Sequence, residues 1–185
     1  MKKILILSLL ALLLTSCSGK WNQADPEMPE ELRTLHEEAL DAELAILEED
    51  PENLDALFGT AFRYHQLGDW KKAVKYYEKV LKLSPADWAS LNNLAYIYET
   101  MEDYDQAAFY IKKLYESDPD NTEVISDTVR ILLLAGDSVS AQLALENFAR
   151  VVLDPENPDT DMQIFISDLY EATYQWNQEN EQVAN

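Results

Sequence analysis

The sequence predicts an all-α protein: an α-solenoid of about three helix pairs, with an N-terminal half-repeat helix and a C-terminal capping helix. The first observation is a period of 34 residues, at which prolines recur: Pro51, Pro85 and Pro119. The second is composition, because 47% hydrophobic residues and only 4 glycines in 185 residues favour helices over a β-sandwich. A fixed period of this length is typical of stacked repeats, each burying its apolar face against the next.

Residues 1–16 predict a secretory signal that is not part of the fold. Lys2 and Lys3 precede an apolar run over residues 4–14, which is too short to span a bilayer. The end of the segment, Leu14-Thr15-Ser16-Cys17, resembles the lipobox of bacterial lipoproteins, which implies cleavage before Cys17 and acylation of that cysteine. Cys17 is the only cysteine, so it has no partner for a disulfide. An ordinary signal peptide with an incidental cysteine is the alternative.

The charge of the chain excludes some classes of partner. The net charge is −21, and it becomes −23 when Lys2 and Lys3 leave with the signal. Nucleic acid is therefore excluded as a partner, because phosphate binding depends on Lys and Arg. The acidic body is also not expected to lie on an anionic membrane, so lipid on Cys17 must hold it there. Ser18 after the cysteine is compatible with sorting to an outer membrane, facing the periplasm.

The helices follow a polar segment that predicts a flexible tether, residues 17–29. We expect the first helix over residues 29–49, in a half unit spanning 30–53 whose Ala39 precedes Ala73 by one period. The apolar side chains of this helix are expected to form one inward face: Leu32, Leu35, Ala39, Leu40, Leu44 and Leu47.

Three repeats follow, over residues 54–87, 88–121 and 122–155. The expected helix pairs are 53–67 and 70–83, 87–100 and 104–115, and 122–134 and 139–152. Gly68 suits a left-handed turn after the first helix of its pair, and Asp69 and Asp103 suit caps of the second helices. The third unit is less regular, because its proline, Pro155, comes two residues late. We expect residues 159–176 to form a capping helix and residues 177–185 to be a polar tail.

Two kinds of residue recur at this period. Small residues recur where the two helices of a pair must approach closely, and larger apolar residues fill the space between the helices. The small positions are Ala61, Ala95 and Val129 on the first helices and Ala73, Ala107 and Ala141 on the second. Larger apolar positions include Leu57, Leu91 and Ile125, and Tyr77, Ile111 and Leu145. This pattern, with its closing proline, resembles the tetratricopeptide repeat (TPR). Glu102 departs from the family, which favours Gly there. The resemblance implies a right-handed solenoid that binds proteins.

In that family the first helices line a concave groove that takes a partner's peptide or helix. Carried over to this chain, the groove residues are Phe58, Phe62, His65, Asn92, Tyr96, Glu99 and Arg130. Their spacing of i, i+4 and i+7 places them in one stripe on each helix, and aromatic residues are favoured anchors at interfaces. A flanking helix covering this groove is the alternative. Some members of that family bind a partner's C-terminal carboxylate with a clamp of polar and basic residues. This clamp is excluded here, because Asn93 is the only one of its positions that carries the expected residue.

No catalytic residues, metal ligands or cofactor are predicted. The two histidines, His36 and His65, lie on different helices without a metal-binding motif, and no glycine-rich phosphate loop is present. A stripe of Lys71, Lys75, Lys79 and Lys82 is a second candidate surface, although a solvated convex face is the simpler explanation.

The sequence therefore predicts a non-enzymatic scaffold: a lipid-anchored TPR adaptor in a bacterial cell envelope that binds a protein through its groove. The alternative is an accessory subunit that captures an exported peptide or polymer for a transporter or a cell-wall enzyme.

Overall fold

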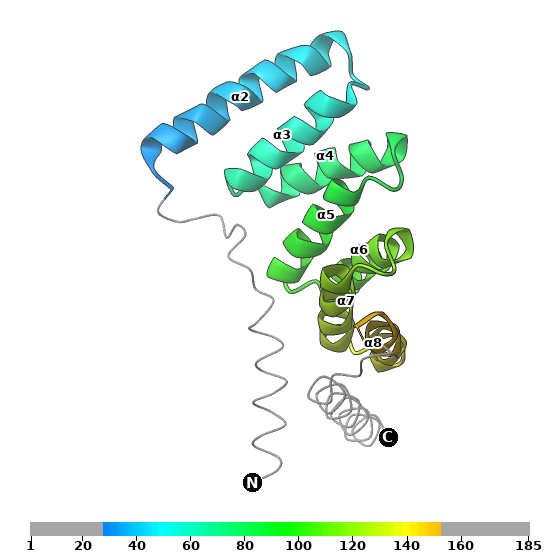
Figure 1. Cartoon of the computed structure of the whole chain (residues 1–185). Coiled ribbons are helices and arrows are strands. Elements are labelled where there is room, and N and C mark those ends of the chain that lie inside the picture. The colour runs from blue at the N-terminus through cyan, green and yellow to red at the C-terminus, as the bar shows by residue number, and fades with distance from the viewer. Residues whose placement is uncertain (1–27, 153–185) are drawn as a thin grey trace. The chain divides into compact units, whose positions relative to one another are not determined.

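The computed structural model describes residues 28–152, which contain seven α-helices and no strand (Figure 1). Their bounds differ from the predicted helices by at most two residues at either end, so the all-α prediction is confirmed. The helices are α2 (Glu30–Glu49), α3 (Leu54–Gln66), α4 (Trp70–Leu83), α5 (Trp88–Thr100), α6 (Tyr104–Ser117), α7 (Thr122–Leu134) and α8 (Ser138–Val152). The predicted signal, the lipidated cysteine, the capping helix 159–176 and the tail 177–185 lie outside the described residues.

Short polar side chains cap the N-termini of the helices from α3 to α8. The Asn53 side chain accepts a hydrogen bond from the Ala56 N–H at 3.0 Å, and Asp87 accepts one from Ser90 at 2.8 Å. Asp69 and Asp103 cap α4 and α6 in the same way, as predicted. Because such caps satisfy backbone donors that have no partner within the helix, they fix where each helix begins.

The turn inside each pair uses one left-handed residue. Gly68 and Gly136 have φ angles of 80° and 77°, and Glu102 occupies the same position with φ of 58°. Around Glu102 the backbone N–H groups of residues 102 and 103 donate to the carbonyls of Glu99 and Tyr98. The turns at Gly68 and Gly136 repeat this pattern, so Glu102, a residue other than glycine, adopts the same turn.

The chain divides into two compact units, which are described separately; the boundary falls after Leu114. In the first unit, α2 packs against α3, α3 against α4, and α4 against α5. The positions that recur every 34 residues form its core, as predicted. Its fully buried side chains include Leu57, Ala61, Ala73, Tyr77, Leu91, Ala107, Ile111 and Leu114.

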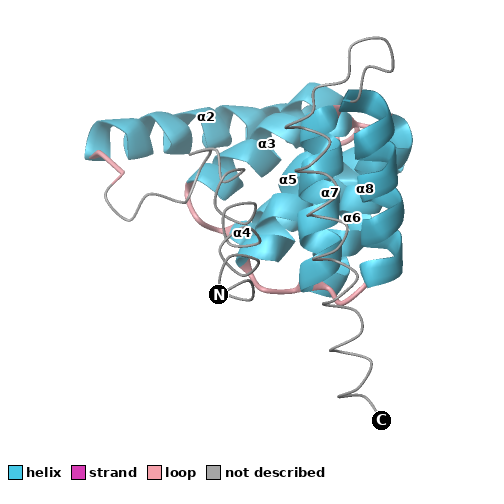
Figure 2. Cartoon of the chain, turned by 60° about the horizontal axis from the view of Figure 1, so that its bottom comes forward, coloured by secondary structure: helices cyan, strands magenta, loops and turns pink. Residues whose placement is uncertain are grey.

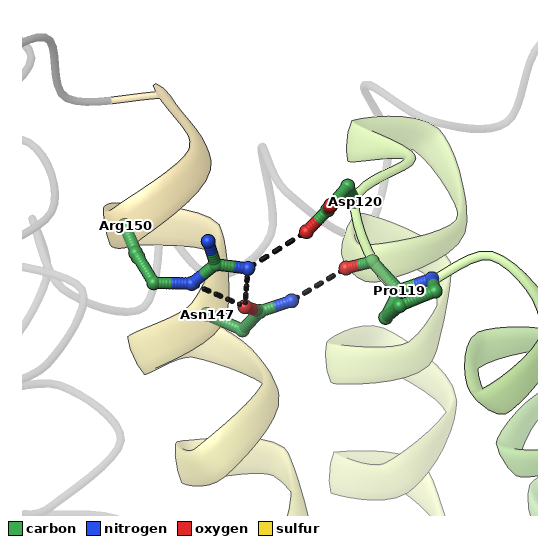
Figure 3. Close-up of polar contacts among 4 residues, drawn as sticks. All are labelled: Pro119, Asp120, Asn147 and Arg150. Atoms are coloured by element: carbon green, nitrogen blue, oxygen red, sulfur yellow. Dashed lines mark hydrogen bonds and ion pairs between the residues drawn. The ribbon is translucent and has the colours of Figure 1, made fainter.

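In the second unit α7 packs against α8 around Ile125, Val129, Ala144 and Leu145. Polar contacts close this pair at the end away from its glycine turn (Figure 3). The Asn147 side chain donates to the Pro119 carbonyl. Arg150 donates to the carboxylate of Asp120 at 2.7 Å and to the Asn147 side chain.

The prediction for the inward face of α2 is wrong in part. Leu40 is buried, but Leu32 and Leu35 are 42% and 58% exposed. The buried face instead includes His36, which is 8% exposed. The reason is that α2 packs against α3 through a stripe that starts at His36, and Leu32 and Leu35 lie beside that stripe rather than within it.

Candidate functional site

The candidate site is the α3–α5 face, which we define by Phe58, Phe62, Asn92, Tyr96 and Glu99. Phe58 and Phe62 lie one turn apart on α3, and the other three residues lie on α5. All five side chains are half-buried, so each retains a surface that another molecule can contact.

A chain of ring contacts joins the aromatic residues of this face across three helices. Phe58 of α3 meets Tyr77 of α4 edge-on, with ring centroids 5.6 Å apart. His65 lies 6.4 Å from Tyr77 and 5.7 Å from Tyr96 of α5. The contact of His65 with Tyr96 places the first helices of two successive pairs side by side, as the repeat pattern predicts.

His65 is a core residue rather than a groove residue, which corrects the sequence prediction. It is 3% exposed, because its ring fills the space between those of Tyr77 and Tyr96. Burial lowers the pKa of His65 to about 4, and the polar side chain of Asn93 acts in the opposite direction. His65 is therefore neutral at pH 7, and it supports the α3–α5 face from beneath.

The N-terminal helix contacts Phe62, whose side chain stays half-buried, so a flanking helix covers this residue only in part. The His36 ring of α2 meets the Phe62 ring edge-on, with centroids 6.4 Å apart. The Arg63 guanidinium lies 5.4 Å from the centre of the same ring. Phe58 and Tyr96 are thus better candidates for direct contact with a partner than Phe62.

Beside Phe62, three titratable side chains form a cluster that the sequence prediction missed. Arg63 Nη1 donates to His36 Nδ1 at 3.2 Å, and its Nε lies 3.5 Å from a Glu43 carboxylate oxygen. Burial raises the pKa of Glu43, although the positive charge of Arg63 acts in the opposite direction. Burial also lowers the pKa of His36, and the charge of Arg63 lowers it further. The Glu43 carboxylate lies over Gly59, where an added Cβ would be only 2.5 Å away.

The sequence does contain a signal for this cluster. Glu43 stands one period before Tyr77, in a column whose later members, Tyr77, Ile111 and Leu145, are fully buried. A charged residue in a core column indicates a partner of opposite charge on the facing helix, and Arg63 is that partner.

Arg130, the remaining predicted groove residue, belongs to the second unit. Its side chain is 16% exposed and forms an ion pair with Asp127, one turn earlier on α7, at 2.9 Å. The role of Arg130 beside Tyr96 in one groove stays a prediction.

The predicted lysine stripe lies on α4. Lys71, Lys75 and Lys82 are exposed, and Lys79 is half-buried with its Nζ 4.5 Å from the centre of the Tyr76 ring. The stripe is thus a solvated face with one cation–π contact, and it contains no apolar anchor.

Residues 28–152 contain no group of three or more His, Cys, Asp or Glu side chains placed to hold a metal ion. No helix in this part of the chain has the length and hydropathy needed to cross a membrane.

Comparison with protein families identifies the repeats. Two models described as "Tetratricopeptide repeat" match residues 54–87 and 89–121, which contain α3 with α4 and α5 with α6. The chain has the fold of a TPR solenoid. The TPR matches end at residue 121, so the α7–α8 pair and the half unit α2 lie outside them.

Solved structures with this TPR fold include several of MamA. A structure described as "Crystal structure of MamA" has a TM-score of 0.58 and 12% sequence identity, covering 87% of this chain and 98% of that one. "MamA 41-end from Desulfovibrio magneticus RS-1" has a TM-score of 0.56 and 16% identity, covering 80% of this chain and 85% of that one. At these identities the likeness concerns the fold alone. A search of curated protein sequences finds no match.

Proposed function

We propose that this protein is a non-enzymatic scaffold that binds a partner protein through the α3–α5 face. The observation that carries the proposal is the pair of half-buried aromatic side chains, Phe58 and Tyr96, on neighbouring first helices. Buried rings of Tyr77 and His65 hold both side chains in place, so little conformational entropy is lost when a partner binds. Rigid aromatic side chains of this kind supply much of the binding energy at protein interfaces.

The polar residues of the face favour a peptide or a helix as the ligand. The Asn92 amide can both donate and accept hydrogen bonds, as a peptide backbone requires. Glu99 adds a negative charge on the same helix, one turn after Tyr96. The expected ligand therefore places apolar side chains on Phe58 and Tyr96 and a neutral or basic residue near Glu99. Stacked helical repeats commonly bind such segments on an extended concave surface.

We further propose that acylated Cys17 anchors the scaffold in a bacterial cell envelope, at an outer membrane facing the periplasm. The support is the likeness of residues 14–17 to a lipobox and the acidic composition, which requires a lipid for stable membrane attachment.

Recovery of the partner by truncation variants tests the binding proposal. Tyr96→Ala removes an anchor from the α3–α5 face, whereas Phe109→Ala removes an exposed aromatic ring from α6. We expect the wild type and Phe109→Ala to retain the same protein from solubilised membranes. Tyr96→Ala should bind it about tenfold or more weakly in titrations.

Equal binding by both variants would contradict the proposed face. If the wild type instead captures only small peptides or glycans, the protein is an accessory subunit that delivers an exported ligand to a transporter or a cell-wall enzyme. Circular dichroism of each variant, compared with the wild type, establishes that the helices are retained.

The anchor has a separate test, because it does not depend on the α3–α5 face. Cys17→Ser should abolish metabolic labelling by a palmitate analogue and move the protein out of the membrane fraction or leave it uncleaved. Labelling that persists in this variant would overturn the lipid anchor and leave the binding proposal intact.

A further inference from the structure

Helix α2 carries an apolar stripe that none of the other helices within residues 28–152 covers. We call it the α2 seam: Leu32, Leu35, Ala39, Ala42 and Ile46. The spacing of these residues alternates between three and four, which places them in one line about 21 Å long on an α-helix. Leu32, Leu35 and Ile46 are 42%, 58% and 46% exposed. Figures 1 and 2 both show α3 along one side of α2. The seam lies beside that contact, because Leu32, Leu35 and Ile46 stay exposed while His36 and Leu40 are buried.

The repeat pattern explains why the seam is open. One period later, in α4, Ala73 and Val80 occupy the positions of Ala39 and Ile46, and both are buried where α4 packs against α3, the first helix of its own pair. In contrast, α2 is the first helix of the part of the chain that the structure describes, and no first helix precedes it there. The seam is thus the surface on which a pair would hold its first helix, and a helix is the shape that fits it.

The charges around the seam select the kind of helix. α2 contains eight Asp and Glu residues and, apart from His36, a single basic one, Arg33. Glu31 and Glu38 lie one turn from Leu35 on the border that faces away from α3, and both are exposed. A helix that docks on the seam therefore meets a row of carboxylates along its open edge. Lys or Arg beside its apolar stripe would be attracted, and Asp or Glu would be repelled.

Residues 153–185 and a second copy of this chain are excluded as occupants by the same charges. Residues 153–185 contain eight Asp and Glu and no Lys or Arg. The seam of a second copy would bring another eight acids against the first eight. The lysine stripe of α4 offers cations but no exposed apolar row between them. An anionic membrane surface is repelled as well.

We propose that the α2 seam binds a basic amphipathic helix from a partner protein, which completes the half repeat as a first helix would. This surface is distinct from the α3–α5 face, and neither proposal depends on the other. Leu35 contributes little to folding, because more than half of its surface stays in water.

The test uses a designed probe, a labelled 21-residue peptide of three heptads with Leu on its apolar stripe and Lys beside it. Fluorescence anisotropy follows its binding to the full-length chain in a mild detergent at physiological ionic strength. A counterpart with Glu in place of Lys should not bind. Leu35→Glu should weaken binding of the Lys peptide by about tenfold or more, as loss of a buried interface leucine does.

The chain supplies a matched control. Leu143 of α8 is 60% exposed, so Leu143→Glu makes the same exchange at a site of the same exposure. Nonspecific attraction of a cationic peptide to an acidic protein would be equally strong in the two variants, and at least as strong as in the wild type, because each variant adds one negative charge. A loss confined to Leu35→Glu can therefore arise only at the seam. Tyr96→Ala should bind the Lys peptide like the wild type, which separates the seam from the α3–α5 face.

Two results would overturn the inference. The first is no binding of the Lys peptide by the wild type, or equal binding by Leu35→Glu and Leu143→Glu. The second is a wild-type dimer in sedimentation experiments that Leu35→Glu converts to a monomer, because the occupant would then be a second copy. Ile46→Gln, which adds no charge, repeats the comparison if Leu35→Glu fails to fold.

Discussion

His65 is a titratable group inside a cluster of rings, and this position couples stability to pH. Its pKa is about 4 in the folded protein, against 6.5 for an unperturbed histidine. Between these values the unfolded chain binds more protons than the folded one, so unfolding is favoured as the pH falls. The stability that neutral His65 provides is complete above pH 6.5 and is lost progressively towards pH 4.

We expect the free energy of unfolding to fall by about 2 kcal/mol from this residue alone between pH 7 and pH 5. Urea denaturation at the two pH values measures it. His65→Phe keeps a ring between Tyr77 and Tyr96 but removes the proton, so it should flatten the dependence on pH. The raised pKa of Glu43 acts with the opposite sign in both proteins and cancels in the comparison. An equally steep fall in the variant would show that another group is responsible.

The three residues at the left-handed turn position show what a side chain costs there. Gly68 and Gly136 adopt positive φ without a Cβ, whereas Glu102 adopts it with one. A residue with a Cβ is destabilised by about 1–2 kcal/mol in this conformation. Glycine avoids that strain, but it loses more conformational entropy on folding, which offsets part of the gain.

At the scale of a helix terminus we therefore predict that Glu102→Gly stabilises the protein by about 0.5–1 kcal/mol. Gly68→Ala, which introduces the opposite change at the equivalent turn, should destabilise it. Thermal melts of the two variants beside the wild type provide the measurement. If Glu102→Gly lowers the melting temperature, the Glu102 side chain makes a contact that outweighs its backbone strain.

The helices could be predicted from the sequence, because period, caps and turns are local signals that agree with one another. The orientation of α2 could not. Its apolar residues are numerous enough for two stripes, and periodicity alone does not say which stripe meets α3. The Glu43–Arg63 ion pair decides which stripe faces α3. When α2 is turned so that Glu43 meets Arg63, Leu35 lies outside the contact. His65 was misplaced for a related reason, because a histidine at the end of a groove column is compatible with either the surface or the core.

The charge of the whole molecule has a consequence for its stability. A net charge of −21 is spread over 185 residues, with acidic ends on either side of a nearly neutral middle. Repulsion among these charges is greater in the folded state than in the expanded unfolded chain, and salt screens it. We expect the melting temperature to rise by a few degrees between about 10 mM and 150 mM NaCl, where the Debye length falls from roughly 30 to 8 Å. A scanning-calorimetry series in NaCl tests this. A decrease would mean that ion pairs such as Arg150–Asp120 outweigh the repulsion.

Polar contacts between residues that are near in sequence link successive parts of the described chain, which favours fast folding. Four such hydrogen bonds connect positions 27 to 32 apart: Arg63 with His36, Tyr110 with Glu78, Asn147 with Pro119 and Arg150 with Asp120. Helical proteins dominated by such near contacts fold in microseconds to milliseconds. A ribosome needs about 2–7 s to add one 34-residue repeat at 5–20 residues per second. A pair therefore forms faster than the next 34 residues are made, so the pairs can fold in the order in which they become available.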